Sequence, residues 1–438
     1  MTISRRGFGL GLAALAAMAM PLRGQAAGDA GAQVMRQWYR LMLELVRHTP
    51  TYSPPVASRA FAYTGIIAHE VLRGGPGGGV TLAGQLNELL PLPERESGAV
   101  HDEAVLLNAA LALAVKQFFA NTGPTGQRAM QAMEKALTRQ VETGVAPDVL
   151  RRSRDFAEAV VLHVSAWSGA DRGAVVENLG FPETWELTPG PAHWVPTSTV
   201  AVQQKPLLPF WGNVRPFAMP EGNSCPLPPP PAYSEDPSSE FYKEAKEVYD
   251  TVNALTKEQR AIAAFWSDDP MLSSTPPGHW ISIAMTELDL EAAPATRWAA
   301  VMARLGITLA DAFIGCWHSK FEYDLVRPIT YIQRVIDPKW QPILNTPPFP
   351  EYPSGHSTQS GAAAAVLDAV FGADHAFVDG THLDDGIPER PFANFQAAAQ
   401  EAGISRLYGG IHFRAAIERG LDQGACIGAH AVGLRIEA

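Results

Sequence analysis

Apolar residues recur at helical spacing through most of this chain, and that periodicity is what most limits its fold. Val34, Trp38, Leu41, Met42 and Leu45 follow one another at intervals of three and four residues, which places them on one face of a helix. Similar segments lie at 55–73, 102–121, 124–143, 146–168, 278–290, 294–326, 354–372, 391–408 and 412–436. Almost no segment alternates apolar and polar residues as a strand does. The sequence therefore predicts an all-α protein of two packed helical bundles.

Residues 171–237 differ in composition from the helical segments on either side. They are rich in Pro, Gly and Trp, and they include the run Cys225-Pro-Leu-Pro-Pro-Pro-Pro-Ala232. A disordered linker can have this composition, but Trp194, Phe210 and Trp211 favour an ordered segment lying over the helices. We therefore expect an N-terminal helical bundle at 28–170, a Pro-rich ordered connector at 171–237 and a second helical bundle at 238–438. Within the second bundle, Thr256 and Gln259 are spaced as a capping box.

The N-terminus has the composition of an export signal. Ser4-Arg5-Arg6-Gly-Phe8 precedes an apolar stretch from Gly9 to Met20, and small residues follow near Ala27. Adjacent arginines before a short apolar region indicate a twin-arginine signal peptide at 1–27. A membrane anchor is the alternative, but roughly a dozen apolar residues are too few to span a bilayer. We expect export to the periplasm or beyond, and no later segment reaches transmembrane length without charges.

The net charge argues against two classes of partner. Removing the signal takes away three arginines and moves the formal charge from −11 to −14. So acidic a chain is not expected to bind nucleic acid or an anionic membrane surface.

The three cysteines allow at most one internal disulfide. Cys316 and Cys426 both lie in segments expected to be helical, where each is most simply a small buried apolar residue. No CxxC or HExxH spacing for a metal site occurs.

Three short motifs near the C-terminus together carry the residues needed to hold an oxyanion. They are Lys320-Phe-Glu-Tyr-Asp-Leu-Val-Arg327-Pro328, Pro353-Ser354-Gly355-His356 and Ser405-Arg406-Leu-Tyr-Gly-Gly-Ile-His412. The spacing of seven predicts that Lys320 and Arg327 lie on nearly the same face of one helix, which ends before Pro328. Ser354 is placed as an N-cap, and Gly355 would let an anion approach the helix start. The two glycines before His412 permit a bend that brings it towards Arg406.

Each motif alone has an ordinary explanation. Lys320 and Arg327 could be surface charges, the histidines could be structural, and Ser354 could simply cap a helix. The order and closeness of all three motifs favour a site, here called the cage, within the second bundle.

The set resembles the signature shared by vanadium-dependent haloperoxidases and type 2 phosphatidic acid phosphatases, K-x6-RP, PSGH and SR-x5-H, without a substitution. The resemblance implies an all-α catalytic bundle and vanadate as cofactor. His412 would bond to vanadium, or else be the nucleophile that takes up phosphate, and His356 would be the acid–base residue. The groups implied to bind the remaining oxygens are Lys320, Arg327, Arg406, the Ser354 hydroxyl and the Gly355 N–H. Lys320 would also polarise bound peroxide.

Residues outside the cage favour the haloperoxidase branch. Trp317 and Phe349 resemble aromatic residues that line the halide side of haloperoxidase pockets, although both could be plain core. Asp269, or next Asp268, resembles the carboxylate beside the second arginine, here Arg406. The following Thr275-Pro-Pro-Gly-His279 segment is similar to bacterial members but suggests no role for His279.

The preferred function is a haloperoxidase that uses hydrogen peroxide to oxidise halide, with iodide or bromide favoured. A small organic acceptor is compatible with this chemistry. The alternatives are an acid phosphatase with a phosphohistidine intermediate, and an oxyanion-binding protein. The sequence specifies neither the halide nor the oligomeric state.

Overall fold

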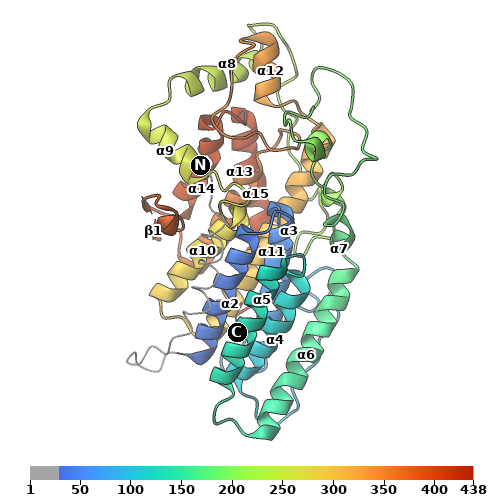
Figure 1. Cartoon of the computed structure of the whole chain (residues 1–438), viewed down its shortest axis with the longest axis vertical. Helices are drawn as coiled ribbons and strands as arrows, with labels where there is room; N and C mark the ends of the chain where they lie inside the picture. The colour runs from blue at the N-terminus through green and yellow to red at the C-terminus, as the bar shows by residue number, and fades with distance from the viewer. Residues whose placement is uncertain (1–28, 438) are drawn as a thin grey trace.

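The structure, a computed structural model, describes residues 29–437, in which two groups of helices lie along one long axis (Figure 1). The predicted signal peptide at 1–27 lies outside the described residues. The first group comprises α2 (Ala30–Arg47), α3 (Pro54–Leu72), α4 (Glu103–Phe118), α5 (Pro124–Val141), α6 (Pro147–Gly169) and the short α7 (Gly173–Val176). The second comprises α8 (Glu240–Asn253), α9 (Lys257–Phe265), α10 (Thr275–Leu290), α11 (Ala295–Tyr323), α12 (Pro328–Val335), α13 (Gly355–Phe371), α14 (Phe395–Tyr408) and α15 (Arg414–Val432).

The remaining regular elements are short. Three 3₁₀ turns occur at η1 (Ala201–Gln204), η2 (Trp211–Asn213) and η3 (Leu383–Asp385). Strands β1 (Phe377–Asp379) and β2 (Arg390–Phe392) pair antiparallel, with Phe377 opposite Phe392 and Asp379 opposite Arg390. The predicted all-α fold is thus confirmed. The small β-ribbon was not predicted, because strands of three residues are too short to show an alternating pattern of apolar and polar residues.

Helix α11 is the central element, and it joins the two groups by packing along α3. A Cβ on Gly65 would lie 2.7 Å from the Met302 carbonyl oxygen, and one on Gly306 would lie 2.8 Å from the Ala62 Cα. Glycine at both positions therefore lets the two backbones come into direct contact. As a result, buried apolar residues of both groups form one continuous core.

Helix α11 is also long and apolar enough to cross a membrane by length and composition, alone in this respect among helices of residues 29–437. Its most apolar window is 94% buried inside the protein. Burial of this kind is typical of the core helix of a globular domain.

The end of α11 differs from the prediction. The helix stops at Tyr323, and Asp324 takes a left-handed conformation with φ of 45°. Arg327 is then the extended N-cap of α12, with Pro328 at the first helical position. The two-turn spacing expected between Lys320 and Arg327 is therefore wrong, because Pro328 begins a new helix after the earlier one has already ended.

The connector lies against the helices through backbone contacts. The Trp194 N–H donates to the Asp324 carbonyl (2.9 Å), and the Leu207 N–H donates to the Pro348 carbonyl (2.8 Å). Three successive N–H groups, of Phe217, Ala218 and Met219, donate to the Asp311 carboxylate of α11 at 2.6–2.8 Å.

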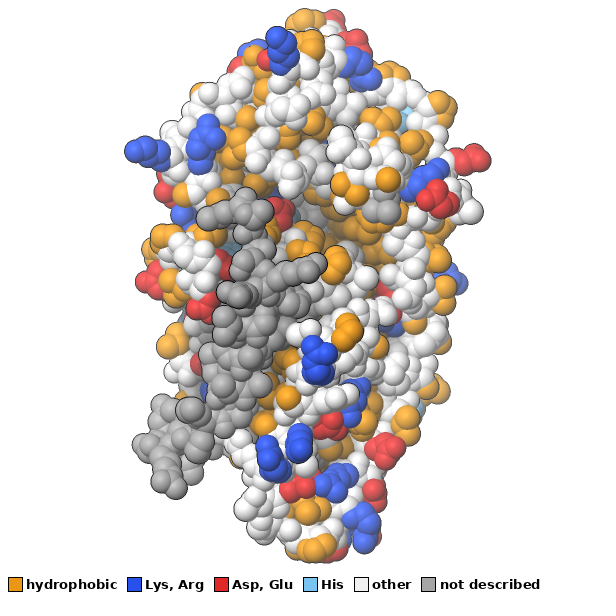
Figure 2. Space-filling model, in the orientation of Figure 1, with side chains coloured by type: hydrophobic (Ala, Val, Ile, Leu, Met, Phe, Trp, Pro, Cys, Tyr) orange, Lys and Arg blue, Asp and Glu red, His pale blue; other side chains and the backbone are white. Residues whose placement is uncertain are grey.

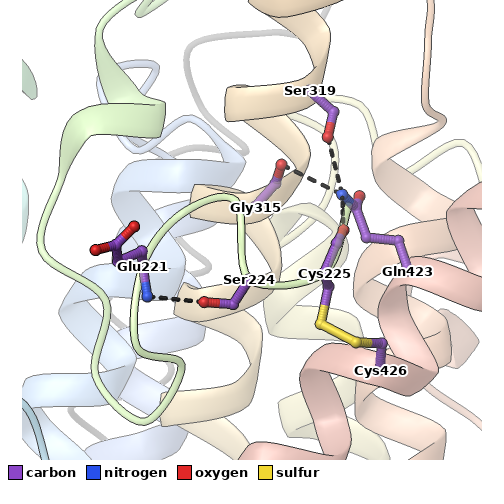
Figure 3. The surroundings of a disulfide bond; sticks show 7 residues. All are labelled: Glu221, Ser224, Cys225, Gly315, Ser319, Gln423 and Cys426. Carbon is purple, nitrogen blue, oxygen red and sulfur yellow. Dashed lines mark hydrogen bonds between the residues drawn. A yellow bond between two sulfur atoms is a disulfide. The ribbon is translucent and has the colours of Figure 1, made fainter. Parts of the chain in front are cut away.

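A disulfide between Cys225 and Cys426 ties the connector to α15 (Figure 3). Beside it, Gln423 Nε2 donates to the Cys225 carbonyl oxygen and to Ser319 Oγ, one residue before Lys320. The expectation of a simple buried Cys426 thiol is wrong, since its Sγ meets that of Cys225 when α15 packs under the connector. Cys316 is a buried free thiol, as predicted.

Candidate active site

The fold brings all three motifs to one buried place between α11, α12, α13, α14 and the start of α15. Arg327 Nη1 lies 3.1 Å from His412 Nε2, and Arg406 Nη1 lies 3.3 Å from His356 Nε2. Lys320 and Arg327 are fully buried, and Arg406 and His412 nearly so. On the molecular face drawn in Figure 2, by contrast, cationic and anionic side chains are interspersed. The predicted concentration of positive charge is internal.

Lys320 is held by backbone carbonyl groups of the segment that leads into α13. Its Nζ donates to the carbonyl oxygens of Pro350 (2.9 Å), Glu351 (3.0 Å) and Pro353. The ammonium also lies 5.1 Å from the centre of the Phe349 ring. Burial, with a further contribution from Arg327, lowers the pKa of Lys320 to about 7. The three carbonyl acceptors match the three N–H groups of an ammonium, so Lys320 in its charged form fixes the shape of the 350–353 segment.

The two arginines each keep one donor group unused. Arg327 donates to the carbonyl oxygens of Phe349 and Ile411, and Arg406 Nε donates to Ser405 Oγ. Nη2 of both arginines is buried and has no hydrogen-bond partner among residues 29–437. Burial lowers the pKa of each guanidinium to about 10, which still leaves both charged at neutral pH. Unpaired buried donors on charged groups are costly, so an anion that meets them is stabilised.

The start of α13 faces the same place. Ser354 is its N-cap, as predicted, and its Oγ accepts from the Ser357 N–H (3.3 Å). The N–H groups of Gly355 and His356 lie at the helix start, where no intrahelical acceptor exists. A Cβ on Gly355 would make only ordinary contacts, at 3.8 Å to Phe313 and 3.9 Å to Trp317. Since the protein leaves room for a side chain there, a glycine is best explained by close approach of an anion to the backbone.

His412 is oriented by a carboxylate that the motif pattern did not indicate. Its Nδ1 donates to Glu351 Oε1 (2.8 Å), and the Phe413 N–H donates to the same oxygen (2.8 Å). This fixes the tautomer with a lone pair on Nε2, beside Arg327. Burial and the nearby Arg327 charge hold the pKa of His412 well below its usual range. A neutral imidazole with a carboxylate behind it is the usual state of a metal-ligating histidine. The only sequence signal for Glu351 is a lone charge in a Pro-rich apolar run.

His356 faces Arg406 on one side and Asp268 on the other. Its Nε2 lies 3.8 Å from Asp268 Oδ2. Burial, and next Arg406, hold the pKa of His356 well below its usual range. Asp268 and Asp269 both attract Arg406, but neither is hydrogen-bonded to it. Asp268 is buried against histidines while Asp269 is partly exposed, so the structure places Asp268 deeper in the site than Asp269.

The two aromatic residues predicted to line a halide pocket lie together beside Lys320. The rings of Trp317 and Phe349 are 4.9 Å apart, and Trp317 Nε1 donates to the Leu207 carbonyl of the connector (3.2 Å). Trp317 therefore also supports the connector. Their role towards halide stays a prediction.

These residues fit a tetrahedral or trigonal-bipyramidal oxyanion such as vanadate. Two orphaned guanidinium donors, a glycine at a helix start and a neutral histidine nitrogen converge there, which supplies cations, N–H donors and one ligand atom.

Comparisons with known proteins show similarity in sequence and in fold. Residues 300–436 match the family model of the VCPO second helical-bundle domain. A solved structure described as the first bacterial vanadium-dependent iodoperoxidase is 34% identical and has a TM-score of 0.85, covering 95% of this chain and 98% of that chain. Holo-type and apo-type structures of bacterial vanadium-dependent chloroperoxidase have TM-scores of 0.67 and 0.66 at 16% identity, covering 88% and 87% of this chain and 92% and 93% of theirs. At that identity they show a shared fold alone. A comparison with curated protein sequences gives no match.

Proposed function

Since this chain belongs to the vanadium-dependent haloperoxidases, we propose that it holds vanadate in the cage and uses hydrogen peroxide to oxidise halide. The observation that carries the proposal is the pair of buried, unpartnered Nη2 groups on Arg327 and Arg406, which lie beside the two cage histidines. When bound, vanadate would supply a Lewis acid that activates peroxide without a change in its own oxidation state.

The roles of the protein's own residues follow from their contacts. His412 offers Nε2 as the ligand atom, because Glu351 occupies its Nδ1–H. Arg327 and Arg406 would offset the negative charge of vanadate, and their Nη2 groups and the N–H groups at the start of α13 would hold its oxygens. His356 is neutral and lies at the edge of the cage, so it can take a proton from incoming peroxide and return it. Lys320 holds the 350–353 segment in place and, in its charged form, would polarise bound peroxide.

The halide is proposed to approach past Trp317 and Phe349, with iodide or bromide as the preferred substrate. Support comes from the 34% identical relative, which is described as an iodoperoxidase. Export to an oxidising compartment is proposed as well, and the Cys225–Cys426 disulfide supports it. Fractionation of the source cells tests that localisation: recovery of the protein from the cytoplasm alone, with reduced cysteines, would refute it.

The test of the function is a paired assay on purified protein. With orthovanadate, hydrogen peroxide and iodide, bromide or chloride, we expect vanadate-dependent halide oxidation and no comparable hydrolysis of a phosphate ester. His412→Ala should abolish the oxidation, because it removes the ligand nitrogen. The control is His375→Gln, which alters a histidine paired with Glu287 away from the cage and should keep activity. Phosphate-ester hydrolysis without halide oxidation would assign the cage to a phosphatase instead.

A further inference from the structure

A second cluster of buried titratable residues lies behind His356. It consists of Asp268, His279 of α10, Asp379 of β1 and His382, all nearly inaccessible to solvent. His279 Nδ1 lies 3.1 Å from both oxygens of Asp268, and its Nε2 lies 2.7 Å from Asp379 Oδ2. With a carboxylate at each ring nitrogen, both nitrogens must carry hydrogen, so His279 is an imidazolium. Burial acts to lower the pKa of His279, but the two carboxylates outweigh it and raise the pKa to about 10.

The Asp268 carboxylate that contacts His279 also faces the cage. Oδ2 lies 3.8 Å from His356 Nε2, and Asp268 also attracts Arg406. On a third side, His382 Nε2 lies 3.3 Å from Oδ1. Asp268 is therefore the one group of the cluster that faces both cage residues and the buried His279.

The surroundings of His279 hold it firmly. Its ring stacks on Trp266 at 4.5 Å between centroids and 15° between planes, and Asp379 Oδ1 accepts from the Thr381 N–H (3.0 Å). The loop that carries Asp268 needs such support, because Asp268, Met271 and Thr275 all have positive φ of 47–69°. Such conformations persist when the surrounding structure enforces them.

We propose that His279 is a positioning residue: anchored by Asp379, it holds the Asp268 carboxylate towards His356 and Arg406 and so determines how firmly these two bind an oxyanion. The inference rests on the proposed function, in that His356 and Arg406 are taken to bind the vanadate oxygens. It gives the Thr275–His279 segment a role that the sequence did not provide.

Two variants of the same residue separate positioning from mere support. The amide nitrogen of His279→Asn takes roughly the place of Nδ1 and keeps the bond to Asp268. The amide nitrogen of His279→Gln reaches roughly the place of Nε2. This variant therefore keeps the hydrogen bond to Asp379 and loses the one to Asp268. Both lose the ring and the charge, so a purely structural role would affect both alike.

The readout is binding of inorganic phosphate to vanadate-free protein by calorimetry, which requires no turnover. We expect His279→Gln to weaken phosphate binding by about 10-fold or more, as loss of an orienting partner does at metal sites, and His279→Asn to weaken it clearly less. His375→Gln is the matched control and should bind phosphate as the wild type does. Equal affinities in the Asn and Gln variants would overturn the proposal. If either variant fails to fold, Asp379→Asn replaces it, where weaker phosphate binding supports the anchoring and unchanged binding overturns it.

Failure of this inference can be told from failure of the proposed function. Wild-type protein that binds phosphate but oxidises no halide refutes the function and leaves the test above intact. Halide oxidation with equal phosphate affinities in both variants refutes positioning alone.

Metal analysis adds a further outcome, because Asp268, His279 and His382 offer ligand atoms within 4.8 Å of one another. About one divalent first-row ion per vanadate-free chain, lost in His382→Ala, would make this cluster a cation site and overturn the hydrogen-bonded arrangement.

Discussion

The positions of Lys320 and Arg327 are set mainly by uncharged backbone carbonyl groups. Carbonyl oxygens of residues 349, 350, 351, 353 and 411 accept from Lys320 and Arg327, so the positions of these cations depend on the path of a Pro-rich segment. The exception is Glu351, whose carboxyl group lies directly behind His412. The orientation of His412 therefore depends on a single acceptor oxygen.

This dependence gives a prediction for Glu351. Glu351→Ala leaves the His412 Nδ1–H and the Phe413 N–H without an acceptor, and we expect vanadate affinity to fall by about 10–100-fold. Glu351→Gln is the matched variant, because it keeps an oxygen at the same place. Because both N–H groups donate to Oε1 alone, the amide should retain most of the affinity. Titration of vanadate-free protein with orthovanadate measures both; equally weak binding by the two variants would contradict this account.

At this scale the sequence indicated the motif residues that the fold brings together, but not how each is held. The spacing of Lys320, Arg327, Ser354, Arg406 and His412 is a property of the chain, so the motif alone could identify them. Glu351 could not be found in this way, because its role depends on the turn that brings residue 351 beside residue 412. Asp269 was preferred to Asp268 as the partner of Arg406 from its position in the sequence alone. Position in the sequence does not show which of two adjacent carboxylates is buried.

Among the elements, α11 carries the most structural connections. Its last two turns supply Trp317 and Lys320, its middle packs on α3, and Asp311 accepts from three successive N–H groups of the connector. The Asp311 carboxylate thus supplies the acceptors that a helix or strand would otherwise supply to these three backbone N–H groups.

We predict that Asp311→Asn destabilises the protein. The amide has one acceptor oxygen, so at least one buried N–H loses its partner, at a cost of about 1–3 kcal/mol in the free energy of unfolding. Asp422→Asn on the exposed face of α15 is the control, where about 0.5 kcal/mol or less is expected. Chemical denaturation measures both, and equal stability of the two variants would show that the connector is held by other contacts.

Helices were predictable as elements because their apolar faces repeat over several turns. Their ends were less so: α11 stops at Tyr323 through a left-handed Asp324, which no periodicity reveals. The β-ribbon of Phe377–Asp379 and Arg390–Phe392 was missed because three residues are too few to alternate.

In the whole molecule, the two helical groups share one core, and the connector is fastened across it by the Cys225–Cys426 disulfide. Three cysteines allow three pairings, and the sequence does not choose between them. The pairing follows from the packing of α15 under the connector, which is a property of the folded chain.

Removal of this disulfide should be costly. The double variant Cys225→Ser and Cys426→Ser is expected to lower the free energy of unfolding by about 2–5 kcal/mol, since the bond closes a long loop across 201 residues. Thermal melting with and without a reductant checks the same point on the wild type. The control is Cys316→Ala, which removes the buried free thiol. The melting temperature of this variant should still fall when a reductant is added. Identical melting of the wild type in both conditions would show that the bond contributes no stability.

The position of this bond in the chain has a consequence of another kind. Lys320, Arg327, Ser354, His356, Arg406 and His412 all lie between the two bonded cysteines, on a covalent ring. A single proteolytic cut anywhere on that ring, for example in the exposed turn near Gly386, opens the ring without releasing a fragment. The nicked enzyme remains one molecule that carries every oxyanion-binding group. After one such cut, the two parts of the site stay covalently joined until a reductant breaks the disulfide, so the redox state of the surroundings sets how long an enzyme cut once stays whole.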